Sequence, residues 1–480
     1  MAGLAGCVVG PDYVEPEVPV PAEWAAESAA LPAAPPELSR WWQRLDDATL
    51  NALIDEAVAG NLDVATAKAR VREARASYRQ AGGKLLPSLE ASGSATRGWT
   101  HTDIDENGNR INFDGSNDFQ VGFDASWEVD LFGANYRGFE AAGYGLQAAE
   151  EELRATLLTL IGDVAAAYVE ARGYQQRIAL AERTAAAQRN TAELTRIKFD
   201  AGSSSGADVA NAAGQAASTE ATLETLRIGY AESLHRLGVL LGLAPAALSG
   251  RLAEPMSIPV PALPLPLGVP ADLLSARPDL RQAERELAQA TATIGEAEAA
   301  RYPSISLTGS VSTSGVTFGD LASVTSVALS IGPSITIPIF NGGQLEAGVE
   351  IAEAQRDQSY LAYRAAVLTA LEEVENAAVS LTRERGRERR LEESAANFQE
   401  AFRLARALYE NGMTGFLEVL DAERSLYSAQ DSLIDSRIAL ASDYIALNKA
   451  LGGGWDGVVE VSEPVIVDQN TGPHFRSSGE

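Results

Sequence analysis

The sequence predicts a mixed α and β membrane protein, internally duplicated, in which short strands pass directly into very long helices. Three observations predict this fold class. Residues 119–131 alternate between apolar and polar side chains without a break, which is typical of a strand with one apolar face. The residues from 134 onward show a heptad repeat free of proline. Both patterns return roughly 210 residues later.

The composition excludes several classes of protein. The 480 residues include 66 acidic and 38 basic side chains, for a net charge of −28, so nucleic acid would be repelled and is not an expected partner. The single cysteine, Cys7, allows no disulfide within the chain. Because no run of ~18 apolar residues occurs, a membrane span of this chain would consist of strands.

The N-terminal residues predict a lipid anchor. Leu4-Ala-Gly-Cys7 matches the lipobox of bacterial lipoproteins, in which the cysteine thiol is acylated. A buried or chance cysteine is the alternative interpretation. Residues 1–38 are expected to form the lipobox and an extended tether rich in Pro, Ala and Glu. Two or three acyl chains would hold the protein firmly at a membrane, at ~0.8 kcal/mol for each buried methylene.

Residues 39–244 are expected to form a first structural repeat. Helical stretches come first and stop at Pro87, because proline cannot continue a helix. Strands are expected at about 88–99 and 118–132. The intervening 100–118 is rich in Asn, Asp and Gly, which favours an exposed loop between the two strands.

Two long helices, at about 134–201 and 206–242, are expected to complete this repeat as an antiparallel hairpin. The first would be about 100 Å long at ~1.5 Å per residue. Gly202 suits a left-handed C-terminal cap. Ser205-Gly-Ala-Asp208 has the form of a capping box, which favours Asp208 as a helix cap rather than a functional carboxylate.

The second half repeats the first. Residues 245–275 are rich in proline and are expected to be a linker, residues 276–454 a second repeat, and residues 455–480 a C-terminal tail. The expected elements of the second repeat are two strands and two helices, at about 303–315, 324–340, 343–411 and 414–452. Pro333 and Pro338 are expected to mark a bend or irregular pairing where strand becomes helix.

Matching sequence motifs support a duplication. Leu86-Pro-Ser-Leu89 returns as Tyr302-Pro-Ser-Ile305, and Val129-Asp-Leu-Phe132 returns as Ile337-Pro-Ile-Phe340. Arg196-Ile-Lys-Phe-Asp-Ala-Gly202 returns as Arg406-Ala-Leu-Tyr-Glu-Asn-Gly412. The spacing stays near 210 residues throughout, so each half has the same order of strands and helices.

Four strands of this length cannot close a membrane barrel alone. Strands of ~10 to 12 residues span a bilayer when tilted, but membrane barrels begin at about eight strands. Open sheet edges in lipid would leave unpaired backbone groups that each cost several kcal/mol. The chain must therefore share a barrel with copies of itself, through two, three or four chains. A soluble sandwich attached to coiled coils is the alternative.

Several segments together resemble one known family, the outer-membrane efflux proteins of the TolC and OprM group, most closely its NodT-type lipoprotein branch. The segments that support the resemblance are Cys7–Pro16, Trp41–Trp42, Pro270–Glu284, Ile337–Gly343, Leu420–Leu426 and Ala450–Trp455. The resemblance extends from Cys7 to Trp455. Ala276 departs from the usual Arg-Arg-Pro-Asp form, which we attribute to a local packing change.

The resemblance implies a TolC-like homotrimer. Its 12-stranded outer-membrane β-barrel, with four strands per chain, would continue into a periplasmic α-helical coiled-coil barrel with an equatorial belt that includes the linker 245–275. It implies a passive exit duct in the bacterial outer membrane, docked to a periplasmic adaptor and an inner-membrane RND-type transporter, for drugs or other small toxic compounds. A type I secretion duct for proteins or peptides and a structural coiled-coil lipoprotein are the alternatives.

The turn between the last two helices is the candidate functional site. Leu417 and Asp421 are four residues apart and Glu418 precedes Asp421 by three, so the three share one side of a helix. Repeated by symmetry, they would form rings of carboxylate and leucine that attract cations and narrow a pore. The family has an aperture at matching positions. Glu418 as a simple helix cap is the alternative.

The resemblance also assigns roles to other residues of the two turns. Tyr409 matches a tyrosine of the family's aperture, whereas Thr414 replaces an Arg that some relatives use there. The hairpin tips, marked by Gly202, Asp208, Gly412 and Thr414, are expected to dock the adaptor. The three histidines are scattered, so neither a catalytic triad nor a metal site is expected, and the chain is not expected to be an enzyme or to bind a cofactor beyond the lipid on Cys7.

Overall fold

The structure of the chain is a computed structural model. It describes residues 8–21, 24, 38–104, 110–260, 276–323 and 327–459, with the backbone alone for 100–104 and 110–114. The predicted lipobox, including Cys7, lies outside the described residues. So do residues 261–275 of the predicted linker, most of the predicted tether and residues 460–480 of the predicted C-terminal tail.

The chain divides into two compact units. The first comprises Met1–Glu17, Arg72–Ala148 and Ala283–Tyr363, and the second comprises Val18–Val71, Ala149–Gln282 and Arg364–Glu480. One unit boundary lies between Glu17 and Val18, and the other four fall inside helices: α2 (Leu62–Gly83), α3 (Ala134–Asp200), α6 (Pro278–Ala299) and α7 (Gln344–Glu410). The sheet belongs to the first unit, and the turns of both long helical hairpins belong to the second.

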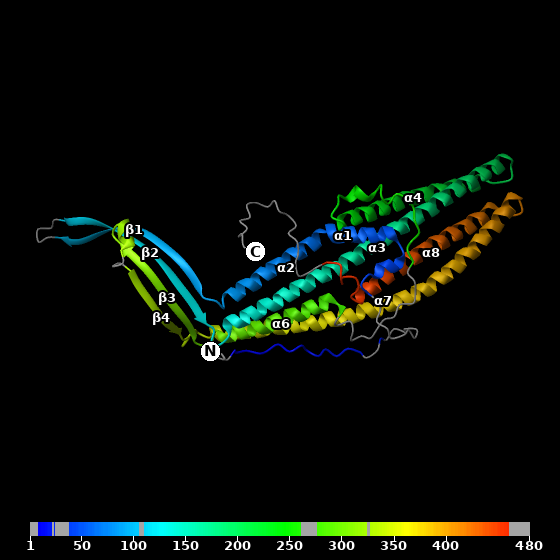
Figure 1. The fold of residues 1–480 in the computed structure, drawn as a ribbon. Coiled ribbons are helices and arrows are strands. Elements are labelled where there is room, and N and C mark those ends of the chain that lie inside the picture. Colours follow the sequence, from blue (N-terminus) through cyan, green and yellow to red (C-terminus); the bar gives the residue numbers. More distant parts are fainter. Residues whose placement is uncertain are drawn as a thin grey trace. The chain divides into compact units, whose positions relative to one another are not determined.

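Four antiparallel strands form one sheet in the first unit, in the order β1-β2-β3-β4 (Figure 1). Their bounds are Ser88–Ile104, Arg110–Val129, Ser304–Gly315 and Val327–Thr336. Phe123 of β2 lies opposite Ala91 of β1 and Val311 of β3, and Val311 lies opposite Leu329 of β4. Because directly opposed residues share a face, the alternation within each strand makes one face of the whole sheet apolar and the other polar.

Two of the strand predictions need correction. The expected loop at 100–118 is mostly strand, because β1 continues to Ile104 and β2 begins at Arg110, paired in register. Backbone hydrogen bonds make this pairing, so it does not require the apolar alternation that marks the rest of β2. β4 is shorter than the expected 324–340 and ends at Thr336. Pro338 lacks an N–H and cannot donate a hydrogen bond to a continuing ladder.

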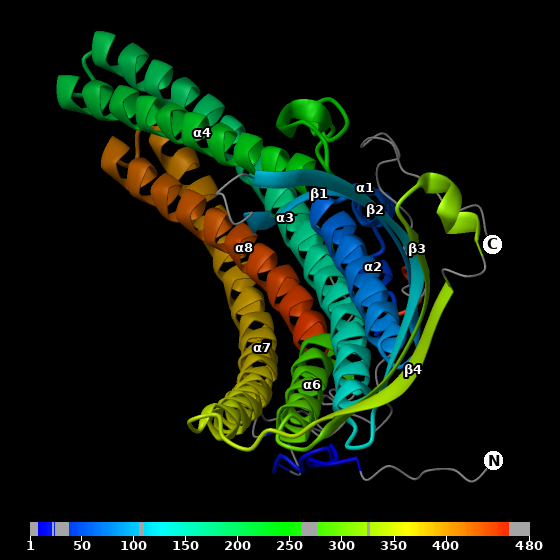
Figure 2. The ribbon, with the colours of Figure 1, turned by 90° about the vertical axis from the view of Figure 1, so that its left-hand side faces the viewer.

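Both repeats contain a long helical hairpin. Helix α3 has 67 residues and is followed by α4 (Gly206–Leu240) with 35, and α7 also has 67 and is followed by α8 (Phe416–Ala450) with 35. Figures 1 and 2 show each second helix doubling back beside the first. These equal lengths agree with the duplication predicted from the sequence.

The two hairpins turn in the same way. Gly202 and Gly412 adopt left-handed conformations with φ of 73° and 72°, as the sequence predicted for Gly202. In the first turn the N–H of Ser203 bonds to the carbonyl of Lys198 at 2.8 Å, and in the second the N–H of Met413 bonds to that of Leu408 at 2.9 Å. This is the Schellman arrangement, which ends a helix sharply.

The core of the second unit lies where the shorter elements pack. The shorter elements of the second unit are η1 (Trp41–Leu45), α1 (Ala48–Gly60) and η2 (Pro245–Leu248). One further short element, η3 (Phe318–Ala322), belongs to the first unit. Trp41 and Tyr444 are almost fully buried, and the Tyr444 hydroxyl donates to the Trp41 carbonyl at 3.2 Å. The Tyr168 hydroxyl donates to the Asp47 carboxylate, which also caps α1. None of the helices among the described residues has the length and apolar character to cross a membrane.

Candidate functional site

The two hairpin turns differ in how their second helices begin. Helix α4 starts with the predicted capping box: the Asp208 carboxylate accepts from the Ser205 N–H at 3.0 Å, and the Ser205 hydroxyl accepts from the Asp208 N–H at 3.1 Å. These bonds to Ser205 hold the pKa of Asp208 below its usual value. Asp208 is therefore a cap. Helix α8 begins at Phe416, and its N-cap residue, Gly415, offers no side-chain cap.

Three predicted aperture residues lie on the exposed side of α8. The side chain of Leu417 is 63% exposed, and Glu418 and Asp421 are also exposed. Val419 and Leu420, between them, are buried. The Thr414 hydroxyl donates to the Glu418 carboxylate, so Glu418 engages the turn instead of closing a capping box. The helix thus presents one leucine and two carboxylates on its solvent side.

Tyr409, grouped with these residues in the prediction, is placed in a different environment. Its ring is buried in a cluster with Phe402 and Phe416, and its centroid lies 6.1 Å from that of Phe416 in an edge-on arrangement. Its hydroxyl lies 3.0 Å from the Thr195 hydroxyl of α3. Because Thr195 already donates to the Thr191 carbonyl, Tyr409 is the donor in this contact. Tyr409 therefore joins α7 to α3.

Lys198 strengthens the same junction. Its ammonium donates to the backbone carbonyl of Tyr409 at 2.7 Å and lies 4.6 Å from the centroid of the Tyr409 ring. That carbonyl lies at the C-terminal end of α7, where a positive charge is favoured by the helix dipole. We call Thr195, Lys198 and Tyr409 the tip tie, because together they connect the ends of the two 67-residue helices.

Sequence analysis missed three residues at this site: Thr195, Lys198 and Glu423. Thr195 and Glu423 are polar side chains at buried positions of their helices. The heptad pattern favours apolar residues at such positions, so these two exceptions can be recognised in the sequence. Lys198 lies in the last turn of α3, a place that favours cations. Tyr409, the partner of Thr195 and Lys198, comes from another helix, which the sequence alone does not bring together.

A second site of interest lies in the first unit, where strand β2 gives way to helix α3. The backbone of Val9 donates to the Phe132 carbonyl at 3.1 Å. The buried Arg137 guanidinium donates to the carbonyls of Val9 and Gly10 and to the Asp12 carboxylate at 2.8 Å. Residues 9–12 of the predicted tether are therefore held against the protein.

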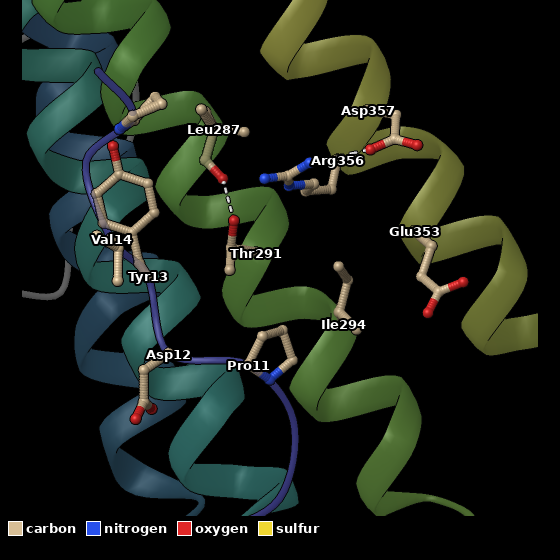
Figure 3. A pocket seen from close by; sticks show the side chains of 11 residues that line it. Pro11, Asp12, Tyr13, Val14, Leu287, Thr291, Ile294, Glu353, Arg356 and Asp357 are labelled. Carbon is tan, nitrogen blue, oxygen red and sulfur yellow. Dashed lines mark hydrogen bonds and ion pairs between the residues drawn. The ribbon is translucent and has the colours of Figure 1, made fainter.

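Residues 8–16, which we call the N-terminal strap, continue along α6. Figure 3 shows Pro11 to Val14 beside this helix, with Arg356 of α7 across a cavity of about 430 Å³. The Tyr13 hydroxyl donates to the Glu284 carboxylate, which also pairs with Arg285. Arg137 and Glu284 thus fix the strap at two points.

Aromatic pairs lie at both ends of the part of the sheet in which β2 pairs with β3. At one end Phe119 contacts Phe318 edge-on, with centroids 6.2 Å apart. At the other, Phe132 stacks on Tyr302 at 4.7 Å. Between these ends the apolar face is uncovered in the single chain: Phe123 is 51% exposed and Leu329 80% exposed. An apolar band between two aromatic girdles is typical of a sheet that faces lipid.

Comparison with known proteins places these features in context. The profile of the outer membrane efflux protein family matches residues 53–243 and 269–453. The chain is 36% identical to Nodulation protein T of Rhizobium leguminosarum bv. trifolii, covering 95% of this chain and 96% of the relative. It is 32% identical to the cation efflux system protein CusC of Escherichia coli O6:H1, covering 94% and 96%. The solved structure of the outer-membrane channel OprN superposes with a TM-score of 0.86 at 33% identity, covering 94% of this chain and all of that one.

Proposed function

The chain belongs to the outer membrane efflux protein family, and we propose that three copies of it form the exit duct of a tripartite efflux pump. Its fold is that of the TolC-like outer-membrane channels, and its location is the outer membrane. Our proposal adds the number of copies, the aperture, the lipid anchor, the pump partners and the class of cargo. The amphipathic sheet with two open edges is the main support.

The sheet requires neighbours. Strands β1 and β4 are its edges, and each presents a row of backbone groups without partners in the sheet. In lipid every such group would cost several kcal/mol, so β4 of one copy pairs with β1 of the next. Three copies give twelve strands, with the apolar face toward lipid and the serine-rich face toward the lumen.

The shared part of the sheet matches the thickness of a membrane. Strand β2 pairs with β3 from Phe119 to Val129. These ten steps at ~3.4 Å span about 34 Å, or about 26 Å along the membrane normal at a tilt of ~40°. This equals the roughly 25 Å apolar band of outer-membrane barrels. The remainder of the β1–β2 hairpin extends beyond that band.

The N-terminal strap supports the proposal of a lipid anchor on Cys7. Val9, two residues after Cys7 in the sequence, donates its N–H to the Phe132 carbonyl at 3.1 Å, at the strand-to-helix junction. That junction carries one of the two aromatic girdles. Acyl chains on Cys7 would therefore enter the leaflet that the girdle faces. Intact-mass analysis should show the acyl mass on the wild-type protein and its absence from Cys7→Ser; equal masses apart from the substitution would contradict the anchor.

The turn between α7 and α8 is the proposed aperture. Leu417, Glu418 and Asp421 project from the same side of α8. Threefold repetition would form an apolar ring and two carboxylate rings, which restrict the pore and favour cations. The tip tie holds the ends of α7 and α3 together and would oppose dilation of these rings.

The proposed partners meet the hairpin tips. Ile197 and Phe199 of the first hairpin and Met413 of the second are 57%, 47% and 68% exposed. Exposed apolar side chains at both tips suit a protein partner, and we assign this surface to a periplasmic adaptor that links the duct to an RND-type transporter. The cargo would be drugs or other small toxic compounds, conducted passively.

Single-channel recording tests the proposed duct. The wild-type protein in planar bilayers should form cation-preferring channels of low conductance. The double variant Glu418→Ala/Asp421→Ala should conduct more and lose cation preference, because both carboxylate rings are removed. Glu400→Ala, which removes an exposed carboxylate from α7, is the matched control and should behave as wild type. Unchanged conductance and selectivity in the double variant would refute the aperture, and no channel at all would refute the duct.

A further inference from the structure

The apolar face of the sheet carries a cation just beyond the aromatic pair that lies farther from the helices. Strand β1 places Ala95 opposite Phe119 and Arg97 opposite Asn117, so Arg97 lies two residues beyond the contact between Phe119 and Phe318, on the same face. In the paired strands that the structure describes, no charged residue lies on this face between the two aromatic pairs. Arg97 is therefore the first charge beyond the apolar band.

The position of Arg97 corresponds to the headgroups of a membrane. Two residues advance a strand by ~6.8 Å, which is about 5 Å along the membrane normal at a tilt of ~40°. The headgroup region extends several Å beyond the hydrocarbon core on each side of a bilayer. The guanidinium thus lies among headgroups rather than among acyl chains.

A glycine leaves a space beside Arg97. Trp99 lies opposite Gly115, and a Cβ added to Gly115 would meet Nε1 of Trp99 at 3.0 Å and Nε of Arg97 at 3.6 Å. Both nitrogens are hydrogen-bond donors. Asn117, opposite Arg97, adds an amide group on the same face. Three side chains with N–H groups therefore lie on one face of the hairpin, around a position that has no side chain.

The guanidinium of Arg97 is positioned without being neutralised. Its central carbon lies 5.6 Å from the centroid of the Trp99 ring, a contact that orients the group and leaves its N–H edge available. Among the residues that the structure describes, no carboxylate pairs with it, and Asp118, which pairs with Thr96, belongs to the opposite face. Arg97 and Trp99 are both exposed. A cation placed in this way at a membrane surface favours an anionic headgroup.

Apolar surface continues from this site toward the centre of the band. Ala95 and Gly93 of β1 lie opposite Phe119 and Val121 of β2, which places two small residues beside two larger ones. Val121 is exposed, so this surface is available for contact with acyl chains. Hydrogen-bond donors at the headgroup level and apolar surface beneath them match the two parts of a phosphorylated lipid.

We propose that Arg97, Trp99, Gly115 and Asn117 form a binding site for the phosphate group of a glycolipid in the outer leaflet of the outer membrane. A phosphate monoester carries a charge of about −1.5 to −2 and accepts two parallel hydrogen bonds from a guanidinium. The outer leaflet of bacterial outer membranes consists mainly of phosphorylated glycolipid. The site rests on the proposed function only for the orientation of the sheet, which places this end toward the outer leaflet.

Native mass spectrometry of the delipidated wild-type assembly in detergent tests the site, with purified bisphosphorylated lipid A as the probe. The wild-type protein should bind up to one lipid A for each chain. Arg97→Gln should weaken binding roughly 10-fold or more, because a charge-assisted, bidentate contact is lost. Arg383→Gln, which removes an exposed arginine from α7, is the matched control and should bind lipid A as the wild type does.

Two further variants test the space and the charge separately. Gly115→Ala leaves the charge unchanged but places a methyl group 3.0 Å from Nε1 of Trp99. It should weaken binding about 2- to 10-fold, because the indole hydrogen bond is blocked. Asn117→Asp places a carboxylate opposite Arg97 and should weaken binding at least as much as Arg97→Gln does. It provides the same test if Arg97→Gln assembles poorly.

Other probes separate the possible ligands. Lipid A without its phosphates should not bind. Equal binding of that lipid, or unchanged binding of lipid A by Arg97→Gln and Asn117→Asp, would overturn the site. Phosphatidylglycerol that binds as tightly as lipid A, or inorganic phosphate that displaces lipid A, would overturn the assignment to a glycolipid. Because lipid binding is measured without conduction, a failed site leaves the proposed duct standing, and the channel recordings test the duct without lipid A.

Discussion

Replacing Lys198 by Met should loosen the proposed aperture without unfolding the protein. The change removes the ammonium but keeps an unbranched side chain of similar length at a half-buried position. It deletes the 2.7 Å hydrogen bond to the Tyr409 carbonyl and the contact 4.6 Å from the Tyr409 ring. The hydrogen bond between Tyr409 and Thr195 remains. Only the ionic part of the tip tie is therefore lost.

The magnitude follows from these two contacts. A hydrogen bond from a charged donor contributes about 1.5–3 kcal/mol and an exposed cation–π contact about 0.5–1 kcal/mol. Partial exposure of Lys198 reduces both, which leaves roughly 1–2 kcal/mol in favour of the closed tip. If the closed and open tips are in equilibrium, the open fraction should rise roughly 5- to 30-fold.

The assay is the open probability of single channels in planar bilayers, recorded at fixed salt and voltage. Arg196→Met is the matched control, because it removes one positive charge from the same turn of α3 at an exposed position. An equal effect of the two variants would mean that Lys198 acts through general charge rather than through Tyr409. An open probability of Lys198→Met equal to that of wild type would refute the tip tie as a restraint on the aperture.

Three further predictions concern the caps and the strap. Ser205→Ala should lower the stability of the protein by about 1 kcal/mol, because it removes the capping box of α4; a thermal midpoint equal to wild type would contradict this. Gly415→Ser should lower the open probability slightly, since a serine at the start of α8 adds a cap worth a few tenths of a kcal/mol and meets nothing within 4 Å; a higher open probability would contradict it. Gly10→Ala should release the N-terminal strap, because the φ of 86° at this position is strained for alanine and the added Cβ would lie 2.3 Å from the Cα of Gly295. Unchanged resistance of the strap to proteolysis would contradict its attachment through Gly10.

Much of the fold is encoded locally in the sequence. The strand at Phe119 was predictable because every second residue is apolar up to Leu131. The helix ends near Gly202 and Gly412 were predictable because a left-handed glycine ends a helix in a recognisable way. The polar part of the β1–β2 hairpin was not, because paired backbones hold it and its side chains show no alternation.

The site was only partly predictable for a related reason. Leu417, Glu418 and Asp421 share the exposed side of one helix, which residue spacing alone determines. Tyr409, Thr195 and Lys198 meet across two helices whose contacting residues are more than 200 positions apart in sequence. Such pairings depend on the register between helices, which no single stretch of sequence specifies.

The central claim is that one chain supplies four strands of a barrel completed by two further copies. Subunit counting by native mass spectrometry of the detergent-extracted wild-type protein tests it most directly. The account predicts particles of three chains, because three four-stranded sheets close a twelve-stranded barrel and leave no strand edge in lipid. Particles that contain one, two or four chains would contradict it.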